Sequence, residues 1–253
     1  EKGVQLTCVL PASVYWMIGA EALTGENEAS FGRSGFEDPS GSFREGGKDG
    51  VNLFTMFTRT SFDAGDWVVL LNASAASGGT RSDRGFGEAG TEGEARRADT
   101  RLIGAGVTLR RFIDSNRYLS FQSECMHRRT EGRLYEKDAL EAVRDASLLS
   151  RQSGLYGQAV FKYGMRSRLG VRVDRMLGND RRFDGVRMEG PENLWRLSAM
   201  TEFNPTEFSR IRLQYNEDRS LYRGEGMSFR PEAVRELILQ CNLSIGAHGA
   251  HPF

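Results

Sequence analysis

Apolar and polar residues alternate along most of this chain, in short segments separated by turn-forming residues. The clearest segment is SRIRLQYN at 209–216, where Ile211, Leu213 and Tyr215 alternate with arginine, glutamine and asparagine. Because successive side chains of a strand point to opposite faces, a period of two predicts strands with one apolar and one polar face. The pattern predicts eleven strands, at 4–10, 14–25, 51–62, 67–78, 100–112, 117–128, 154–164, 167–177, 193–204, 208–217 and 233–247.

The connections between these strands alternate in length. Short turns are predicted near LPASV, DAGD, IDSNR, YGMRSR and FNPTEF, whereas longer polar, glycine-rich loops are predicted at about 26–50, 81–98, 129–153, 178–191 and 217–231. Within the third of these loops, the spacing of Leu140, Val143 and Leu148 predicts a short amphipathic helix. Short turns at one end and long loops at the other are typical of bacterial outer-membrane barrels.

The composition of the apolar face favours a membrane barrel over a soluble β domain. Alanine, glycine and threonine stand there beside leucine and phenylalanine, as at Ala73, Ala159 and Ala199. A soluble core must pack densely, whereas lipid fills the gaps on a membrane-facing surface. Aromatic residues near the predicted strand ends suit interfacial girdles, namely Trp16, Trp67, Tyr118, Tyr163, Trp195 and Phe203.

We therefore predict an all-β fold, an antiparallel transmembrane β-barrel with short periplasmic turns and long extracellular loops. Bacterial single-chain barrels have an even number of strands, and the chain begins at Glu1 rather than Met. The eleven strands thus predict a barrel of about 12 strands, with one further strand before Glu1. Residues 1–253 are predicted to form a single barrel domain, truncated at its N-terminus and without a plug domain.

The total charge and the cysteine content add little to the prediction of function. The chain has 34 basic and 34 acidic side chains, which gives no reason to expect a nucleic-acid partner. Cys8, Cys125 and Cys241 lack the spacing of a metal or disulfide motif and are predicted to pack on strand faces.

The polar face of the strands is the candidate functional site. If it faces the inside of the barrel, its charged and amide side chains line a lumen wider than that of an eight-stranded barrel. They would then bias which ions pass. The predicted pore-lining residues are Glu124, Arg172, Asp174, Arg196, Glu202, Arg210, Arg212, Gln214 and Gln240.

Catalysis and metal binding are less favoured by the sequence. His127 falls by parity on the apolar face, and no Ser–His or Asp–His arrangement is apparent, so no enzyme activity and no cofactor are predicted. His248 and His251 provide two of the three or four ligands that zinc needs, so a metal site there is the minority alternative.

Four stretches of the chain resemble a known bacterial family. They are FNPTEFSRIRLQYN at 203–216, LILQCNLSIGAHGAHPF at 237–253, IGAEALTGENEASFG at 18–32 and TRTSFDAGDWVVLLNASAASG at 58–78. They resemble the porin-like outer-membrane proteins described as zinc-regulated TonB-dependent outer membrane receptors. The terminal Phe253 likewise resembles the signature by which the barrel assembly machinery recognises its substrates.

The resemblance implies residence in the bacterial outer membrane, with membrane lipid and the assembly machinery as partners. The predicted function is a porin-like channel for small polar solutes or ions, linked to zinc supply. A TonB-linked receptor or transporter and a non-conducting structural or adhesive barrel are the alternatives. The chain is too short for the 22-stranded barrel with a plug of true TonB-dependent transporters. Formation of a homo-oligomer is left open.

Overall fold

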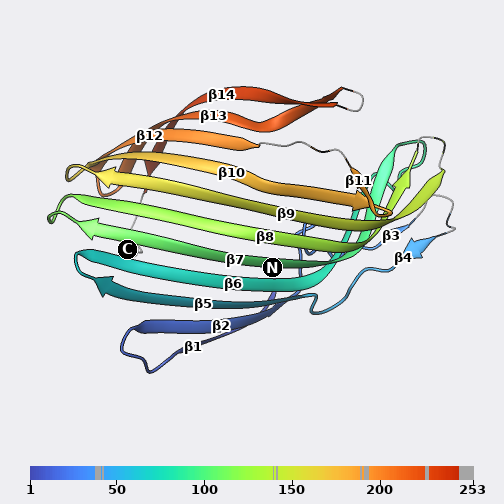
Figure 1. Ribbon diagram of the computed structural model, residues 1–253, viewed down its shortest axis with the longest axis horizontal. Coiled ribbons are helices and arrows are strands. Elements are labelled where there is room, and N and C mark those ends of the chain that lie inside the picture. Colours follow the sequence, from blue (N-terminus) through green and yellow to red (C-terminus); the bar gives the residue numbers. More distant parts are fainter. Residues whose placement is uncertain are drawn as a thin grey trace.

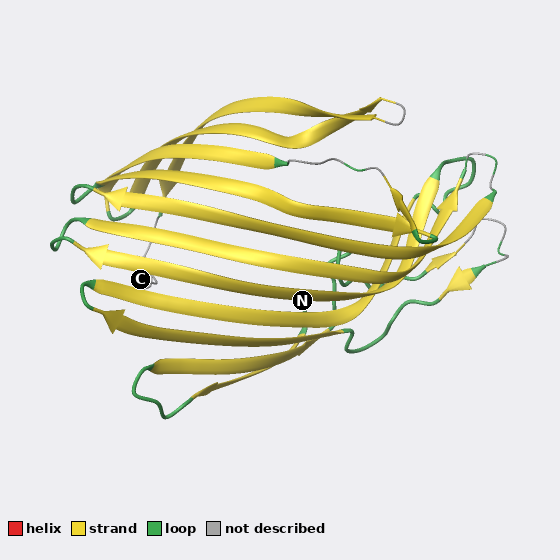
Figure 2. Ribbon diagram, viewed as in Figure 1, coloured by secondary structure: helices red, strands yellow, loops and turns green. Residues whose placement is uncertain are grey.

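The computed structural model describes residues 1–37, 41, 43–138, 140, 142–188, 190, 194–225 and 228–244. Its described residues form strands, turns and irregular segments (Figure 2). The strands are β1 (Gly3–Val9), β2 (Tyr15–Leu23), β3 (Phe36–Glu37), β4 (Arg44–Glu45), β5 (Leu53–Ala64), β6 (Trp67–Arg84), β7 (Gly93–Phe112), β8 (Tyr118–Lys137), β9 (Val143–Lys162), β10 (Ser167–Phe183), β11 (Val186–Met188), β12 (Trp195–Thr206), β13 (Ser209–Glu225) and β14 (Ser228–Leu243).

One antiparallel sheet of 12 strands contains every strand except β3 and β4, which pair only with each other. Its long strands follow the chain in the order β1, β2, β5, β6, β7, β8, β9, β10, β12, β13 and β14, and β11 pairs with β10 (Figure 1). These eleven long strands are the eleven that the alternation predicts, so the all-β antiparallel fold is confirmed. Among the described residues, β1 and β14 are the sheet's edges, because each pairs with a single neighbour.

The register keeps side chains of one kind on one face of the sheet. Val171 of β10 lies opposite both Ala159 of β9 and Ala199 of β12. Arg172 lies opposite Gln158 and Ser198 in the same way. Since paired residues share a face and a one-residue slip would exchange the faces, the apolar pattern excludes shifts by an odd number of residues.

The two ends of the sheet differ as predicted. Short turns join β1 to β2, β5 to β6, β7 to β8, β9 to β10 and β12 to β13 at the end on the left of Figure 1. The opposite end carries the longer connections. The predicted loops 81–98 and 129–153 are, however, mainly strand, because β7, β8 and β9 have 20 residues each and β6 has 18. Much of 178–191 and 217–231 likewise lies in β10, β11, β13 and β14.

The helix predicted around Leu140 to Leu148 is wrong. Within that segment, β8 ends at Lys137 and β9 begins at Val143. Leu148 lies opposite Gly132 and is 5% exposed, so its burial comes from strand pairing rather than from a helix face. No helix among the described residues is long and apolar enough to span a membrane.

Buried apolar side chains gather at the end of the sheet with the long connections. One cluster contains Phe36, Phe86, Ala95 and Tyr135, with Phe43 against it. The rings of Phe36 and Phe86 stand edge to face at 5.9 Å between centroids. A second cluster consists of Leu134, Ala146, Leu148 and Phe183. These clusters hold the strand extensions together.

Candidate functional site

A cavity of about 960 Å³ lies against one face of β7, β8, β9, β10, β12 and β13. On β8 its wall is formed by even-numbered residues from Tyr118 to Met126. On β12 the residues Arg196, Ser198, Met200 and Glu202 continue the wall. We call this the cavity face and the opposite side of the sheet the outer face.

The predicted pore-lining residues all share the cavity face. Seven of the nine line the cavity itself: Glu124, Arg172, Asp174, Arg196, Glu202, Arg212 and Gln214. Gln240 and Arg210 do not line it, although Gln240 lies directly opposite Arg212 and Arg210 is two residues along the same strand. The sequence thus places the residues on a common face, as the strand parity requires.

Arg172 is fixed in the middle of the cavity wall. Its guanidinium Nε donates to both carboxylate oxygens of Asp174, at 3.0 and 2.9 Å. The same guanidinium lies over the ring of Tyr156 at 3.9 Å from the centroid, within range of a cation–π interaction. The Tyr156 hydroxyl accepts from Gln122 Nε2 at 2.7 Å, and Gln158 Nε2 donates to Gln122 at 3.1 Å. Every charge in this group has a partner.

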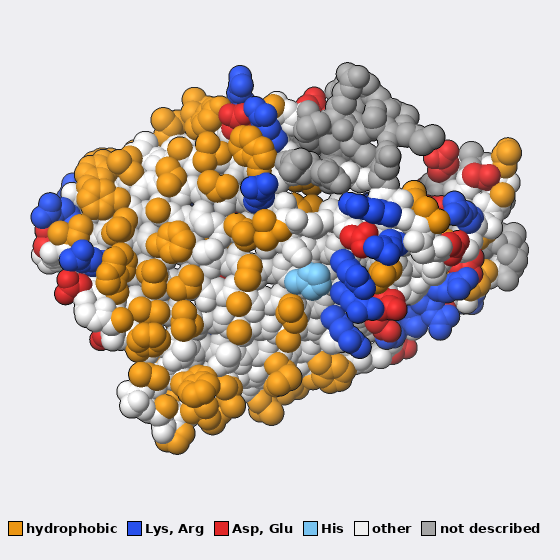
Figure 3. All heavy atoms as spheres, viewed as in Figure 1, with side chains coloured by type: hydrophobic (Ala, Val, Ile, Leu, Met, Phe, Trp, Pro, Cys, Tyr) orange, Lys and Arg blue, Asp and Glu red, His pale blue; other side chains and the backbone are white. Residues whose placement is uncertain are grey.

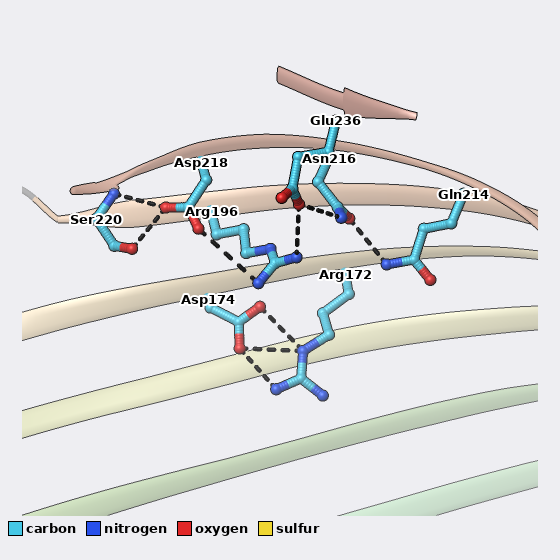
Figure 4. Close-up of polar contacts among 8 residues, drawn as sticks. All are labelled: Arg172, Asp174, Arg196, Gln214, Asn216, Asp218, Ser220 and Glu236. Carbon is cyan, nitrogen blue, oxygen red and sulfur yellow. Dashed lines mark hydrogen bonds and ion pairs between the residues drawn. The ribbon is translucent and has the colours of Figure 1, made fainter. Parts of the chain in front are cut away.

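A second network joins β12, β13 and β14 (Figure 4). Arg196 pairs with Asp218 at 3.8 Å and with Glu236 at 3.6 Å. Asn216, which is fully buried, donates from Nδ2 to Glu236 at 3.1 Å and accepts from Gln214 Nε2 at 2.8 Å. Asp218 falls in the stretch 217–231 that the sequence predicts to be a loop, so parity did not assign it to a face. Glu236 falls on the polar face of the predicted strand 233–247 but is not among the predicted pore-lining residues.

Glu202 is the centre of a third group, nearer the short turns. Its side chain is 1% exposed and accepts from Arg212 at 2.8 Å. Arg168 approaches it at 3.4 Å and Arg210 at 3.9 Å. A buried carboxylate is costly unless it is paired, and here three guanidiniums surround one carboxylate.

The outer face is apolar and exposed to the surroundings. Each long strand contributes at least one large apolar side chain to it, more than a third exposed, and the set runs around the whole sheet. Examples in strand order are Leu6, Ile18, Met56, Leu71, Ile103, Phe121, Leu155, Val171, Leu197, Leu213 and Leu239. Figure 3 shows hydrophobic side chains over the middle and the short-turn end of this face, with charged side chains gathered toward the long connections. We call this surface the apolar belt.

The remaining predicted sites are placed as follows. His127 lies by parity on the outer face, and its Nδ1 is 2.8 Å from Ser153 Oγ. Tyr118 lines the cavity, so it does not belong to an outer aromatic girdle. Among the described residues, no group of three His, Cys, Asp or Glu side chains could hold a metal ion. His248, His251 and Phe253 lie outside the described residues.

Comparison with known proteins gives one curated relative and a similar solved structure. No protein-family model matches the chain. An uncharacterized protein of Aquifex aeolicus (strain VF5) is 39% identical over 253 residues, which is 100% of this chain and 51% of that protein. The chain therefore spans about half the length of the curated relative it matches. Among solved structures, the Pseudomonas putida toluene transporter TodX is similar over 85% of this chain and 67% of its own, with a TM-score of 0.42 and 12% sequence identity.

Proposed function

We propose that this sheet is the wall of a bacterial outer-membrane β-barrel, and that its polar cavity conducts small polar solutes or ions. The observation that carries the proposal is the distribution of side chains between the two faces. Large apolar residues are exposed on the outer face of all eleven long strands. In the same strands, buried side chains on the cavity face include Ser198, Glu202 and Asn216.

A soluble β domain would reverse this arrangement. Soluble monomers rarely expose contiguous apolar patches larger than a few hundred Å², and larger patches mark contacts with proteins or membranes. Here the apolar belt follows the entire sheet, and nine of its eleven long strands have at least 12 residues. A tilted membrane strand needs only about 9–11 residues. Lipid contact accounts for both the extent of the belt and the strand lengths.

A membrane location makes one demand on the sheet's edges. The bilayer core has no water to hydrogen-bond unpaired backbone groups, so only closed sheets span it. The outer edges of β1 and β14 must therefore be paired in the membrane.

Several finer predictions rest on the resemblance or, for His248 and His251, on the histidine pair itself. They are recognition of Phe253 by the assembly machinery, metal binding by His248 and His251, a link to zinc supply, and coupling to a TonB-type partner. The absence of enzyme activity also stays a prediction, and the proposal needs none of these.

Conductance in planar lipid bilayers tests the channel directly. With Cys8, Cys125 and Cys241 replaced by serine, we expect steady open steps from the full-length protein after reconstitution. Adding Ser120→Cys places a thiol in the cavity wall, so a charged methanethiosulfonate reagent should reduce the step size.

Leu119→Cys is the matched control, because Leu119 neighbours Ser120 on the outer face and is 37% exposed. Its reaction with the same reagent should leave the step size unchanged. A folded protein without conductance steps, or an equal reduction of the step size at both positions, would contradict a conducting cavity.

A further inference from the structure

Cationic side chains form a cross-strand row at the short-turn end of the cavity face. Tyr118 lies opposite Lys162, Lys162 opposite Arg168, Arg168 opposite Glu202, and Glu202 opposite Arg212. Paired residues share a face, so these side chains stand side by side across β8, β9, β10, β12 and β13. With Arg110 stacked on Tyr118 and Arg210 beside Arg212, we call the five cations the basic row: Arg110, Lys162, Arg168, Arg210 and Arg212.

One carboxylate serves three members of the basic row. Glu202 contacts Arg212, Arg168 and Arg210 at 2.8, 3.4 and 3.9 Å. A single negative charge neutralises one guanidinium, so two positive charges remain in this group. Glu202 is 1% exposed, whereas Arg212 and Arg168 are 28% and 36% exposed and line the cavity.

The other two members lack an acidic partner. Arg110 and Lys162 make no ion pair among the described residues, and both lie over the Tyr118 ring, at 5.1 and 5.8 Å from its centroid. The Nε atoms of Arg110 and Arg168 are buried without a hydrogen-bond partner in the described part of the chain. Asp63 shares the cavity face at this end, but it lies two strands from Arg110, across Val68.

The middle of the cavity contrasts with this end. There Arg172 is paired with Asp174, and Arg196 with Asp218 and Glu236. The excess positive charge of the cavity is therefore concentrated in the basic row. Charges that line a narrow, low-dielectric passage raise the local concentration of counter-ions.

We propose that the basic row makes the channel selective for anions and binds small oxyanions such as phosphate. This inference rests on the proposed channel function and names its substrate class. Planar guanidinium groups match the geometry of phosphate and carboxylate oxygens, and Arg110 and Lys162 have no acidic partner among the described residues. The position of the row at the short-turn end places this selection at one mouth of the channel.

The reversal potential in a KCl gradient tests the selectivity. A lining potential of about 1 kT per unit charge favours chloride over potassium by roughly sevenfold, and the preference should weaken as salt screens the row. The double variant Arg110→Gln with Lys162→Gln should lower the permeability ratio by at least about twofold. Millimolar inorganic phosphate should reduce the chloride current of the parent chain more than that of this variant.

A matched control removes two positive charges from the same end of the sheet without touching the cavity. Arg111→Gln with Arg166→Gln alters an outer-face residue bound to Asp66 and an exposed turn residue. This control should retain the parent's reversal potential. If the Arg110 and Lys162 double variant fails to show heat-modifiable folding on gels, Arg110→Gln alone is tested in its place.

The possible outcomes separate the two proposals. The anion inference would be overturned by open steps that show no anion preference, or by an anion preference that neither double variant changes. Either result would leave the proposed channel function intact. Silent bilayers would contradict the channel instead. Binding of phosphate is then tested in detergent by the linewidth of the ³¹P signal of inorganic phosphate. The signal should broaden with the parent protein and with the control variant, but not with the Arg110 and Lys162 double variant. Equal broadening in all three, or none, would overturn the site.

Discussion

Replacing Val171 by arginine places a permanent charge in the apolar belt. Val171 is 55% exposed, and its neighbours across β9 and β12 are Ala159 and Ala199. Because both neighbours are small, a longer side chain meets no obstruction, and the effect of the change comes from the charge. In water the substitution would cost little, whereas in lipid it must bring the guanidinium into the hydrocarbon or force it to reach the interface.

The depth of Val171 sets the size of the effect. It lies four residues from Ser167, where β10 begins at the short-turn end. At about 3.4 Å per residue this is roughly 14 Å along the strand. With a strand tilt of about 40°, Val171 lies about 10 Å inside a band about 25 Å tall. Arginine costs about 2–4 kcal/mol at the midplane and about 0–1 near the interfaces, so we expect about 2 kcal/mol at this depth.

Equilibrium unfolding by urea in phospholipid vesicles, followed by tryptophan fluorescence, measures this change. A loss of about 2 kcal/mol corresponds to roughly a 30-fold shift in the unfolding equilibrium constant. Val143→Arg is the matched control, because Val143 is 42% exposed at the start of β9, beyond the belt. It should change the free energy of unfolding by less than about 0.5 kcal/mol. Equal, small effects at both positions would refute lipid contact at Val171.

Three further predictions concern other parts of the chain. Glu202→Gln leaves three guanidiniums facing one another and should lower the free energy of unfolding by about 1–3 kcal/mol. This is less than the full cost of breaking a buried ion pair, because the arginines are partly solvated. Urea unfolding in detergent measures the change, and an unchanged free energy of unfolding would contradict the pairing. Phe86→Ala empties a site that is 0% exposed against Tyr135 and should increase amide hydrogen exchange in the strand extensions but not in the belt, which exchange mass spectrometry resolves. The Ser147 amide donates to Asp184 at the turn after β10, which lowers the pKa of this carboxyl, so the contact is lost as pH falls through that lowered pKa. The protection factor of the Ser147 amide should therefore fall in acid, and Asp184→Asn should remove this acid dependence; an unchanged profile would contradict the contact.

The strands of the belt could be predicted from the sequence because, in the proposed barrel, lipid and lumen impose opposite demands on alternate residues. Ile211 and Arg212 are assigned to their faces by parity alone, and the structure agrees. The extensions were predicted poorly for the same reason. Beyond the belt both faces meet water, so the apolar period of two fades, as at Arg96 and Arg97, and pairing with neighbouring strands determines the structure.

The groupings within the cavity depend on register, which the alternation does not encode. Parity places Glu202 and Arg212 on one face, but only the pairing of β12 with β13 brings them together. The partners of Arg196 show the same limit, since Asp218 comes from a segment taken for a loop. The excess of positive charge in the basic row likewise depends on which residues pair across the strands, so the sequence alone did not predict it.

The central claim is that odd-numbered residues of β10 face lipid and even-numbered residues face a water-filled cavity. Nitroxide labels at single cysteines from Leu169 to Asp174, with the native cysteines replaced, report this in proteoliposomes through collision with oxygen or with a water-soluble nickel chelate. Oxygen should relax the labels at 169, 171 and 173 most strongly, and the nickel chelate those at 170, 172 and 174, giving a period of two in opposite phase. Nickel accessibility at the odd positions equal to or above that at the even ones would contradict the account.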